Sequence, residues 1–226
     1  MNSNQANKFS FIYRKGFVMA FMLVLAMFLS VHIPSSVQAV ESDFEIEDGV
    51  LIGYHGKDKN VVIPSSVKKI AASAFTWNET IVSVMIPSSV KSIENWGEPI
   101  GAFACCTNLQ SVNLPNTITS LPQGVFSDCT SLNSITIPNS VKKIGKWSFA
   151  ACTGLTSVTI PESVEKIGEW TFTDCTNLKS ITIPKSVKKM GPNIFAGCSD
   201  ELVIKCEKGS KAHKYAKKNK IKFSIE

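Results

Sequence analysis

A fixed spacing between prolines constrains this chain more than any other feature. Each of six prolines follows an Ile or a Leu, and successive copies are 23, 28, 23, 23 and 23 residues apart. The six are Pro64, Pro87, Pro115, Pro138, Pro161 and Pro184. Such a period is typical of a solenoid, in which each repeat buries its apolar side against the next one. The 28-residue step is a normal repeat with five additional residues between Glu94 and Gly101, which predicts an inserted loop.

Apolar side chains recur at fixed positions after each proline. The most regular of these positions forms an aromatic column, which consists of Phe75, Phe103, Phe126, Phe149, Phe172 and Phe195. Positions that repeat once per turn must stack, so we expect this column in the core. Leu155, Val158 and Ile160 show the spacing of inward residues on a strand, with Pro161 at its edge. The pattern therefore predicts one short parallel strand per repeat.

Both ends of the array depart from the repeat, as caps of a solenoid must. Near the N-terminus, Asp48-Gly49 separates two apolar segments and predicts a tight hairpin turn. Near the C-terminus, Ser210 is a suitable N-cap for a short helix with Ala212, Tyr215 and Ala216 on one face, and residues 221–225 then alternate like a strand. We predict an α/β-type repeat solenoid with about 23-residue rungs. Its expected parts are a signal peptide (1–39), an N-terminal capping hairpin (40–61), the solenoid (62–204) and a C-terminal cap (205–226).

The first 39 residues have the order of a secretory signal peptide. Three basic residues precede an apolar run from 16 to 29, and the small-residue pattern Val37-Gln38-Ala39 follows, which predicts cleavage after Ala39. A membrane anchor is the alternative, but the run meets Ser30 before it reaches about 18 apolar residues. Cleavage lowers the net charge from +6 to +3, which is too weak to indicate a nucleic-acid partner. We expect a secreted or cell-surface protein whose mature chain has no transmembrane segment.

Seven cysteines in a secreted chain ordinarily suggest disulfides. Five of them share one repeat position, at Cys106, Cys129, Cys152, Cys175 and Cys198. Parallel side chains on neighbouring rungs stay about 4.8 Å apart, beyond the roughly 3.5–4.5 Å between the Cβ atoms of a relaxed disulfide. We therefore expect a ladder of buried free thiols. Cys206 occupies an inward position, whereas Cys105 aligns with Trp77 and Asp128 and is the thiol that we expect to be most exposed.

The unit Leu-x-Ser-Val-Thr-Ile-Pro-x-Ser-Val-x-x-Ile-Gly-x-x-x-Phe-x-x-Cys, from Leu155 to Cys175, closely resembles the BspA-like class of leucine-rich repeats. The resemblance covers roughly residues 44–226, caps included. It implies a secreted or surface protein of a microbe that acts as an adhesin or binding module. It implies no catalytic residues.

The sequence also lacks the patterns that enzymes and metal proteins use. It has no Cys-x-x-Cys pair, no phosphate-binding loop and no His-Glu-x-x-His, and His55 and His213 lie in opposite caps. We therefore predict a protein that is not an enzyme and uses neither a metal nor another cofactor.

Two groups of residues are candidate contacts. Trp147 and Trp170 occupy the same position in consecutive repeats and Trp96 lies in the inserted loop; such rings either contact a ligand or pack over a neighbouring Phe. Lysines recur four or five positions after the proline, at Lys68, Lys69, Lys91, Lys142, Lys143, Lys166, Lys188 and Lys189. This basic edge either attracts an anionic polymer or is a solvated edge that prevents sheets from associating.

The preferred hypothesis is a non-catalytic binding or adhesion module for an extracellular protein or glycan. Its candidate contacts are Trp96, Trp147, Trp170, Lys142, Lys143, Lys188 and Lys189. The alternative is an envelope-associated structural spacer without a specific ligand. Exposed tryptophan rings favour binding, and buried rings favour the spacer.

Overall fold

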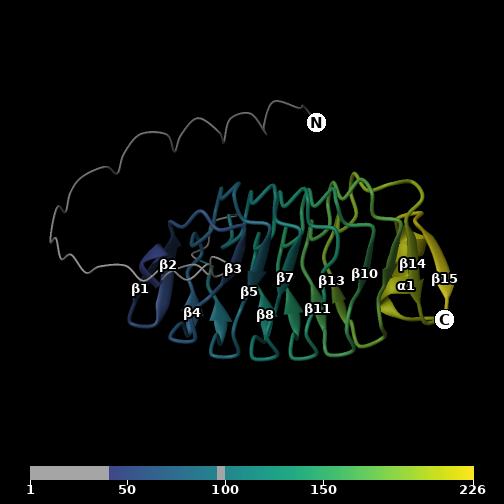
Figure 1. Cartoon of the computed structure of the whole chain (residues 1–226). Coiled ribbons are helices and arrows are strands. Elements are labelled where there is room, and N and C mark those ends of the chain that lie inside the picture. Colours follow the sequence, from purple (N-terminus) through teal and green to yellow (C-terminus); the bar gives the residue numbers. More distant parts are fainter. Residues whose placement is uncertain (1–40, 96–99) are drawn as a thin grey trace, which may run out of the picture. The chain divides into compact units, whose positions relative to one another are not determined.

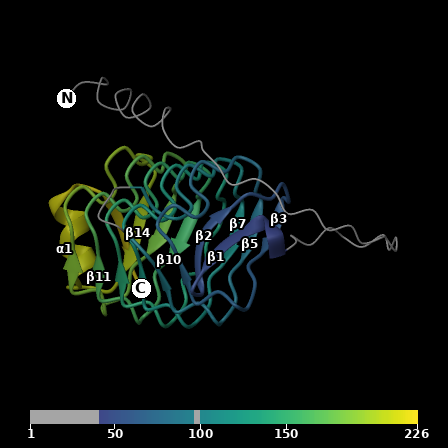
Figure 2. The same ribbon diagram turned by 90° about the vertical axis from the view of Figure 1, so that its left-hand side faces the viewer.

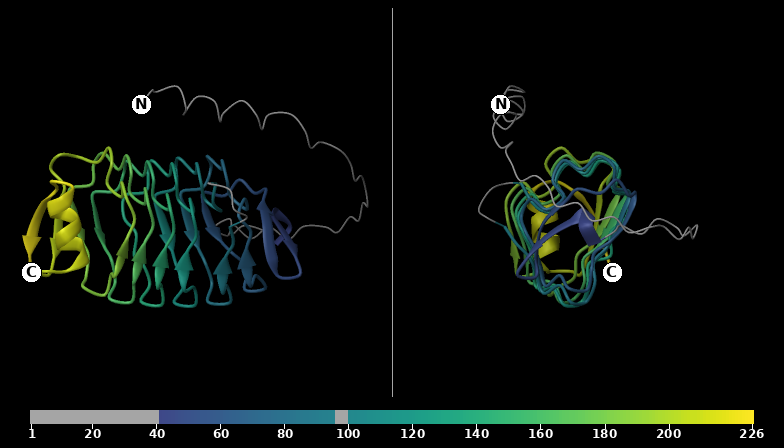
Figure 3. Two further views of the ribbon diagram at one scale, coloured as in Figure 1. Left: turned by 180° about the vertical axis from the view of Figure 1, so that it is seen from behind. Right: turned by 60° about the vertical axis from the view of Figure 1, so that its left-hand side comes forward.

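The computed structural model describes residues 41–95 and 100–226. These residues form a stack of similar turns, which follow one another from right to left in the left view of Figure 3. In the right view of Figure 3 the turns overlap and share a common outline. Trp96 and the expected signal peptide lie outside the described residues. The stacked turns confirm the repeat solenoid with rungs of about 23 residues that the proline spacing predicts.

One side of the solenoid carries the expected strand in every described rung except one. Its strands are β3 (Asn60–Val62), β5 (Ser83–Met85), β7 (Ser111–Asn113), β10 (Ser157–Thr159), β12 (Ser180–Thr182), β14 (Val203–Cys206) and β15 (Lys222–Ile225). They pair in parallel as two sheets, in the orders β3-β5-β7 and β10-β12-β14-β15 (Figures 1 and 2). The two sheets are separate because residues 134–136, at the corresponding position of the intervening rung, form no strand.

A second strand of only two residues follows in each rung, which the sequence did not predict. These strands are β4 (Lys69–Ile70), β6 (Ser92–Ile93), β8 (Ser120–Leu121), β9 (Lys143–Ile144), β11 (Lys166–Ile167) and β13 (Lys189–Met190). Their sheets have the orders β1-β2-β4-β6 and β8-β9-β11-β13, where β1 (Phe44–Glu47) and β2 (Val50–Tyr54) belong to the N-terminal cap. The sequence between β6 and β8 holds the insertion. Each of these strands has one apolar residue that points inward and one polar residue that points outward. Buried Ile144 beside exposed Lys143 is an example.

A stack of phenylalanine rings forms the centre of the core. Phe103, Phe126, Phe149 and Phe172 are fully buried, and the neighbouring ring centroids from Phe75 to Phe195 are 4.9–5.9 Å apart. The stack continues into both caps, through Tyr54 at one end and Tyr215 at the other. Because each ring packs between two others, every rung contributes contacts to both of its neighbours.

The cysteine ladder has a hydrogen-bonding role. Cys106 donates its thiol hydrogen to the Phe75 carbonyl of the preceding rung, at an Sγ···O distance of 3.0 Å, and Cys129, Cys152, Cys175 and Cys198 repeat the contact at 3.0–3.1 Å. All seven cysteines lie within the described residues, and all are free thiols. Burial raises the pKa of Cys106 to about 12 and that of Cys198 to about 11, so these thiols are protonated at neutral pH.

The caps follow the local signals in the sequence. β1 (Phe44–Glu47) and β2 (Val50–Tyr54) form an antiparallel hairpin after a short 3-10 helix (Glu41–Asp43), and Asp48 and Gly49 both have positive φ, as a tight hairpin turn requires. α1 (Lys211–Lys218) begins after Ser210, whose hydroxyl accepts a hydrogen bond from the His213 backbone N–H. Among the described residues, no helix is long and apolar enough to cross a membrane.

Candidate ligand-binding surface

Three lysines stand in register on the two-residue strands of consecutive rungs. Lys143 pairs with Lys166 between β9 and β11, and Lys166 pairs with Lys189 between β11 and β13. All three side chains are exposed, and none makes an ion pair or hydrogen bond with another residue in the described part of the chain. Like charges directly opposite one another on neighbouring strands repel, so this lysine ladder does not stabilise the fold.

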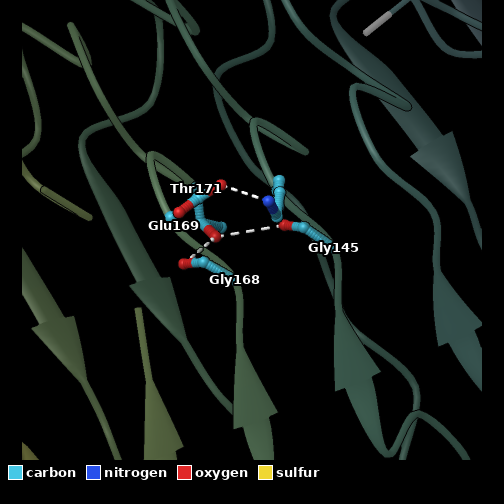
Figure 4. Close-up of polar contacts among 5 residues, drawn as sticks. Gly145, Gly168, Glu169 and Thr171 are labelled. Atoms are coloured by element: carbon cyan, nitrogen blue, oxygen red, sulfur yellow. Dashed lines mark hydrogen bonds and ion pairs between the residues drawn. The ribbon is translucent and has the colours of Figure 1, made fainter. Parts of the chain in front are cut away.

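The lysine ladder lines an open groove of about 580 Å³. Its floor includes the glycines that follow the two-residue strands, and Lys146 and Glu169 form an ion pair beside them (Figure 4). The groove also extends along Ser120 and Leu121 of β8 in the preceding rung. The surface is therefore basic overall and elongated along the direction in which the rungs stack.

The groove has a rigid floor because neighbouring rungs approach closely there. A Cβ atom on Gly168 would lie 2.6 Å from both the Gly145 carbonyl carbon and the Lys146 nitrogen, so only glycine fits at this position. The buried Thr171 hydroxyl donates to the Gly145 carbonyl at 3.1 Å or to the Gly168 carbonyl at 2.9 Å (Figure 4). These contacts fix the spacing of the lysines on the two rungs.

The lysine contacts that we predicted from the sequence belong to two different columns. Lys143 and Lys189 lie in the ladder, together with Lys166, which our list of contacts omitted. Lys142 and Lys188 precede the strands and have Glu165 between them, in a column linked by backbone hydrogen bonds of 2.9 Å. Lys188 also donates to the Lys185 carbonyl at 2.9 Å. The two columns occupy adjacent positions of the repeat, four and five residues after the proline, and our sequence analysis treated them as one edge.

The tryptophans differ in exposure. Trp147 and Trp170 are half-buried, directly after the groove residues Lys146 and Glu169, and both have left-handed backbone conformations, with φ of 52° and 57°. Gly124 and Asn193 hold the same position in the flanking rungs, also with positive φ. A left-handed conformation costs a bulky residue roughly 1–2 kcal/mol, so the backbone does not favour Trp here.

Sequence reasoning missed the most exposed tryptophan of the described residues. Trp77 is 61% exposed and also has a left-handed backbone, with φ of 64°. The alignment that placed it with Cys105 and Asp128 contained a signal, because a large ring is unexpected in a column of small or polar residues. Cys105 itself is half-buried, and burial raises the pKa of its thiol to about 12.

The described residues contain no group of three or more His, Cys, Asp or Glu side chains that could hold a metal ion. The groove offers lysine ammonium groups and one paired carboxylate. This arrangement can attract and hold negative charge.

Stacked rungs with parallel strands and a repeating Phe and Cys core define a leucine-rich repeat solenoid. The chain belongs to the family described as BspA type leucine rich repeat region, which matches in six copies over residues 53–97 and 99–223. A comparison with curated proteins found no match.

Solved structures of bacterial leucine-rich repeat proteins are similar to this chain. A leucine-rich repeat protein of T. pallidum is 26% identical with a TM-score of 0.65, over 83% of this chain and 98% of that one. A leucine-rich repeat protein of Bacteroides ovatus is 29% identical with a TM-score of 0.62, over 72% of this chain and 44% of that one. One from Eubacterium ventriosum is 22% identical with a TM-score of 0.57, over 67% of this chain and 46% of that one, and shows the fold alone.

Proposed function

We propose that this protein is an extracellular, non-catalytic binding module that holds an anionic glycan polymer along the lysine ladder. The observation that carries the proposal is the register of Lys143, Lys166 and Lys189 on neighbouring strands, without an acidic partner in the described part of the chain. The N-terminal sequence supports secretion, because it has the order of a cleaved signal peptide.

A linear anionic ligand suits the ladder for an electrostatic reason. Neighbouring strands are about 4.8 Å apart, so the three ammonium groups form a row of like charges along the groove. A polymer with regularly spaced acidic groups would lower the repulsion within that row as it binds. The close contacts of Gly168 and Thr171 with the preceding rung hold the backbone beneath the row in place before binding, which reduces the entropy lost on association.

Binding is favoured over catalysis by the composition of the groove. Its titratable groups are lysines and Glu169, and Glu169 is already paired with Lys146. These residues therefore do not place a general acid and a general base at one point, as catalysis would require. Under the alternative hypothesis of a structural spacer, the lysines bind no ligand and only prevent sheets of neighbouring molecules from associating.

The test removes the charges of the ladder without changing its length. The variant Lys143→Gln/Lys166→Gln/Lys189→Gln and the parent protein are measured against heparin, hyaluronan and linear polyphosphate by isothermal titration calorimetry. The control Lys57→Gln/Lys217→Gln/Lys218→Gln removes three exposed lysines elsewhere, so that the net charge is the same. We expect the affinity of the ladder variant for at least one polyanion to be at least tenfold lower than that of the parent, while the control binds like the parent.

Other outcomes identify the competing hypotheses. Equal losses in the two variants would mean that only net charge matters. If binding persists in the ladder variant but disappears in Trp147→Ala/Trp170→Ala, the half-buried rings make the contact instead. If a screen of extracellular proteins and glycans finds no ligand for the parent, the spacer hypothesis replaces this proposal.

A further inference from the structure

Trp77 forms an exposed aromatic surface on the rung next to the N-terminal cap. Its side chain is 61% exposed, although its backbone is held firmly by a hydrogen bond of 3.0 Å from the Trp77 N–H to the Ala104 carbonyl of the next rung. An indole ring in water loses the favourable burial that aromatic side chains normally contribute. An exposed ring on a fixed backbone can contact a ligand with little loss of conformational entropy.

Neither the backbone nor the core accounts for a tryptophan at this position. The same position in the following rungs holds Cys105, Asp128, Ala151, Asp174 and Gly197, all with positive φ. Each of Cys105, Asp128, Ala151 and Asp174 also donates its backbone N–H to the next rung. Small residues and aspartate therefore satisfy the geometry as well as a large ring does, and glycine does so without strain. The ring of Trp77 adds nothing that the fold needs.

Trp77 and several polar residues line one open cavity of about 420 Å³. The cavity is lined by Trp77 and Asn78 together with Glu45 and His55 of the N-terminal cap. His55 Nε2 and Glu45 Oε2 are 3.1 Å apart, and both side chains are largely exposed. The Asn78 Oδ1 atom accepts hydrogen bonds from the Thr80 and Ile81 backbone N–H groups, which orients its Nδ2 donor and leaves that donor without a partner in the described residues.

We infer that this cavity is a binding site for a neutral glycan. One face of a sugar ring presents C–H groups that stack on an indole, while its hydroxyls need both donors and acceptors at the rim. Asn78 Nδ2 supplies a donor, and the Glu45 carboxylate supplies an acceptor. The ring nitrogen of His55 that does not contact Glu45, Nδ1, can make a further hydrogen bond. The exposed Glu45 carboxylate repels phosphate, sulfate and uronate groups, so the site selects against the anionic polymers that the lysine ladder attracts.

The site is independent of the proposed function. It lies on the first rung and the hairpin cap, whereas the lysine ladder lies on β9, β11 and β13. Binding at Trp77 should therefore persist in the Lys143→Gln/Lys166→Gln/Lys189→Gln variant, and should change little between 50 and 500 mM salt.

The experiment is affinity gel electrophoresis of the purified protein through native gels that contain dextran, laminarin, yeast mannan, xyloglucan or galactomannan. Calorimetry then gives the affinity for any polysaccharide that retards the protein. The test variant is Trp77→Gly, which removes the ring and suits the left-handed backbone. Ala151→Gly is the matched control, because it makes the same backbone change in the same column without removing a ring.

We expect at least one neutral polysaccharide to retard the parent and the Ala151→Gly control. Trp77→Gly should weaken that binding at least tenfold, and Trp77→Phe should restore part of it. The thermal midpoint of Trp77→Gly should equal or exceed that of the parent, which separates loss of binding from loss of fold. If none of the five polysaccharides retards the parent, or if Trp77→Gly binds like the parent, the inference is wrong.

Discussion

Replacing Phe149 with alanine tests how the solenoid is held together. The ring is fully buried, and its centroid lies 5.6 Å from that of Phe126 and 5.2 Å from that of Phe172, with only 3° between the planes of the latter pair. Phe→Ala in a core costs about 3–5 kcal/mol because the cavity collapses only in part. The two flanking rings are themselves fixed by further rings, so they cannot move in to fill it. We expect a loss in the upper half of that range.

The assay is urea unfolding of the parent, Phe149→Ala and two comparison variants. Phe195→Ala should cost less, because that ring is slightly exposed and its second neighbour, Tyr215, meets it edge-on at 6.0 Å. Lys142→Ala should change the free energy of unfolding by less than about 0.5 kcal/mol, because the side chain is exposed. Equal losses in Phe149→Ala and Lys142→Ala would refute the assignment of the Phe column to the core.

Three further predictions concern the rungs. Iodoacetamide should alkylate the cysteines fully in denaturant without reductant but only slowly in the native protein, and three disulfides by mass spectrometry would contradict the thiol ladder. Burial raises the pKa of the ladder thiols above the ordinary value of 9.0, to about 12 for Cys106, so the unfolded state loses these protons first and stability should fall as the pH rises from about 9 to 12. For each such thiol the slope is at most about 1.4 kcal/mol per pH unit, so Cys152→Ala, which removes a fully buried thiol, should give a shallower decline in urea titrations at pH 8 to 10.5. Gly168→Ala should cost about 1–3 kcal/mol from overpacking against the preceding rung, and a thermal midpoint equal to that of the parent would show that the close approach is absent.

Much of the fold could be predicted because each feature depends on residues that repeat or on a short local signal. The proline period, the Phe column and the Asp48-Gly49 turn indicated the rungs, the core and the hairpin cap. The two-residue strands could not be predicted in this way, since a Lys-Ile pair is a strand only when its neighbours are in register.

The candidate surface was only partly predictable. The lysine columns are visible in the repeat, but only the strand register shows which of them forms a continuous row. Lys166 pairs with Lys143 and Lys189, whereas Glu165 lies between Lys142 and Lys188. The Trp77 site combines the first rung with the cap, so no local motif contains it. Trp96 remains a predicted contact that lies outside the described residues.

The affinity for a linear polyanion as a function of salt tests the central claim most directly. A polyanion that binds in the screen above is titrated into the parent and the ladder variant at 50, 100 and 200 mM NaCl. If the ligand contacts Lys143, Lys166 and Lys189, the affinity of the parent should fall on the order of tenfold or more across this range, as expected when about three charged contacts release counterions. The ladder variant should bind weakly, with a much smaller dependence on salt. An affinity that is independent of salt in the parent, or an equal dependence in both proteins, would contradict the account.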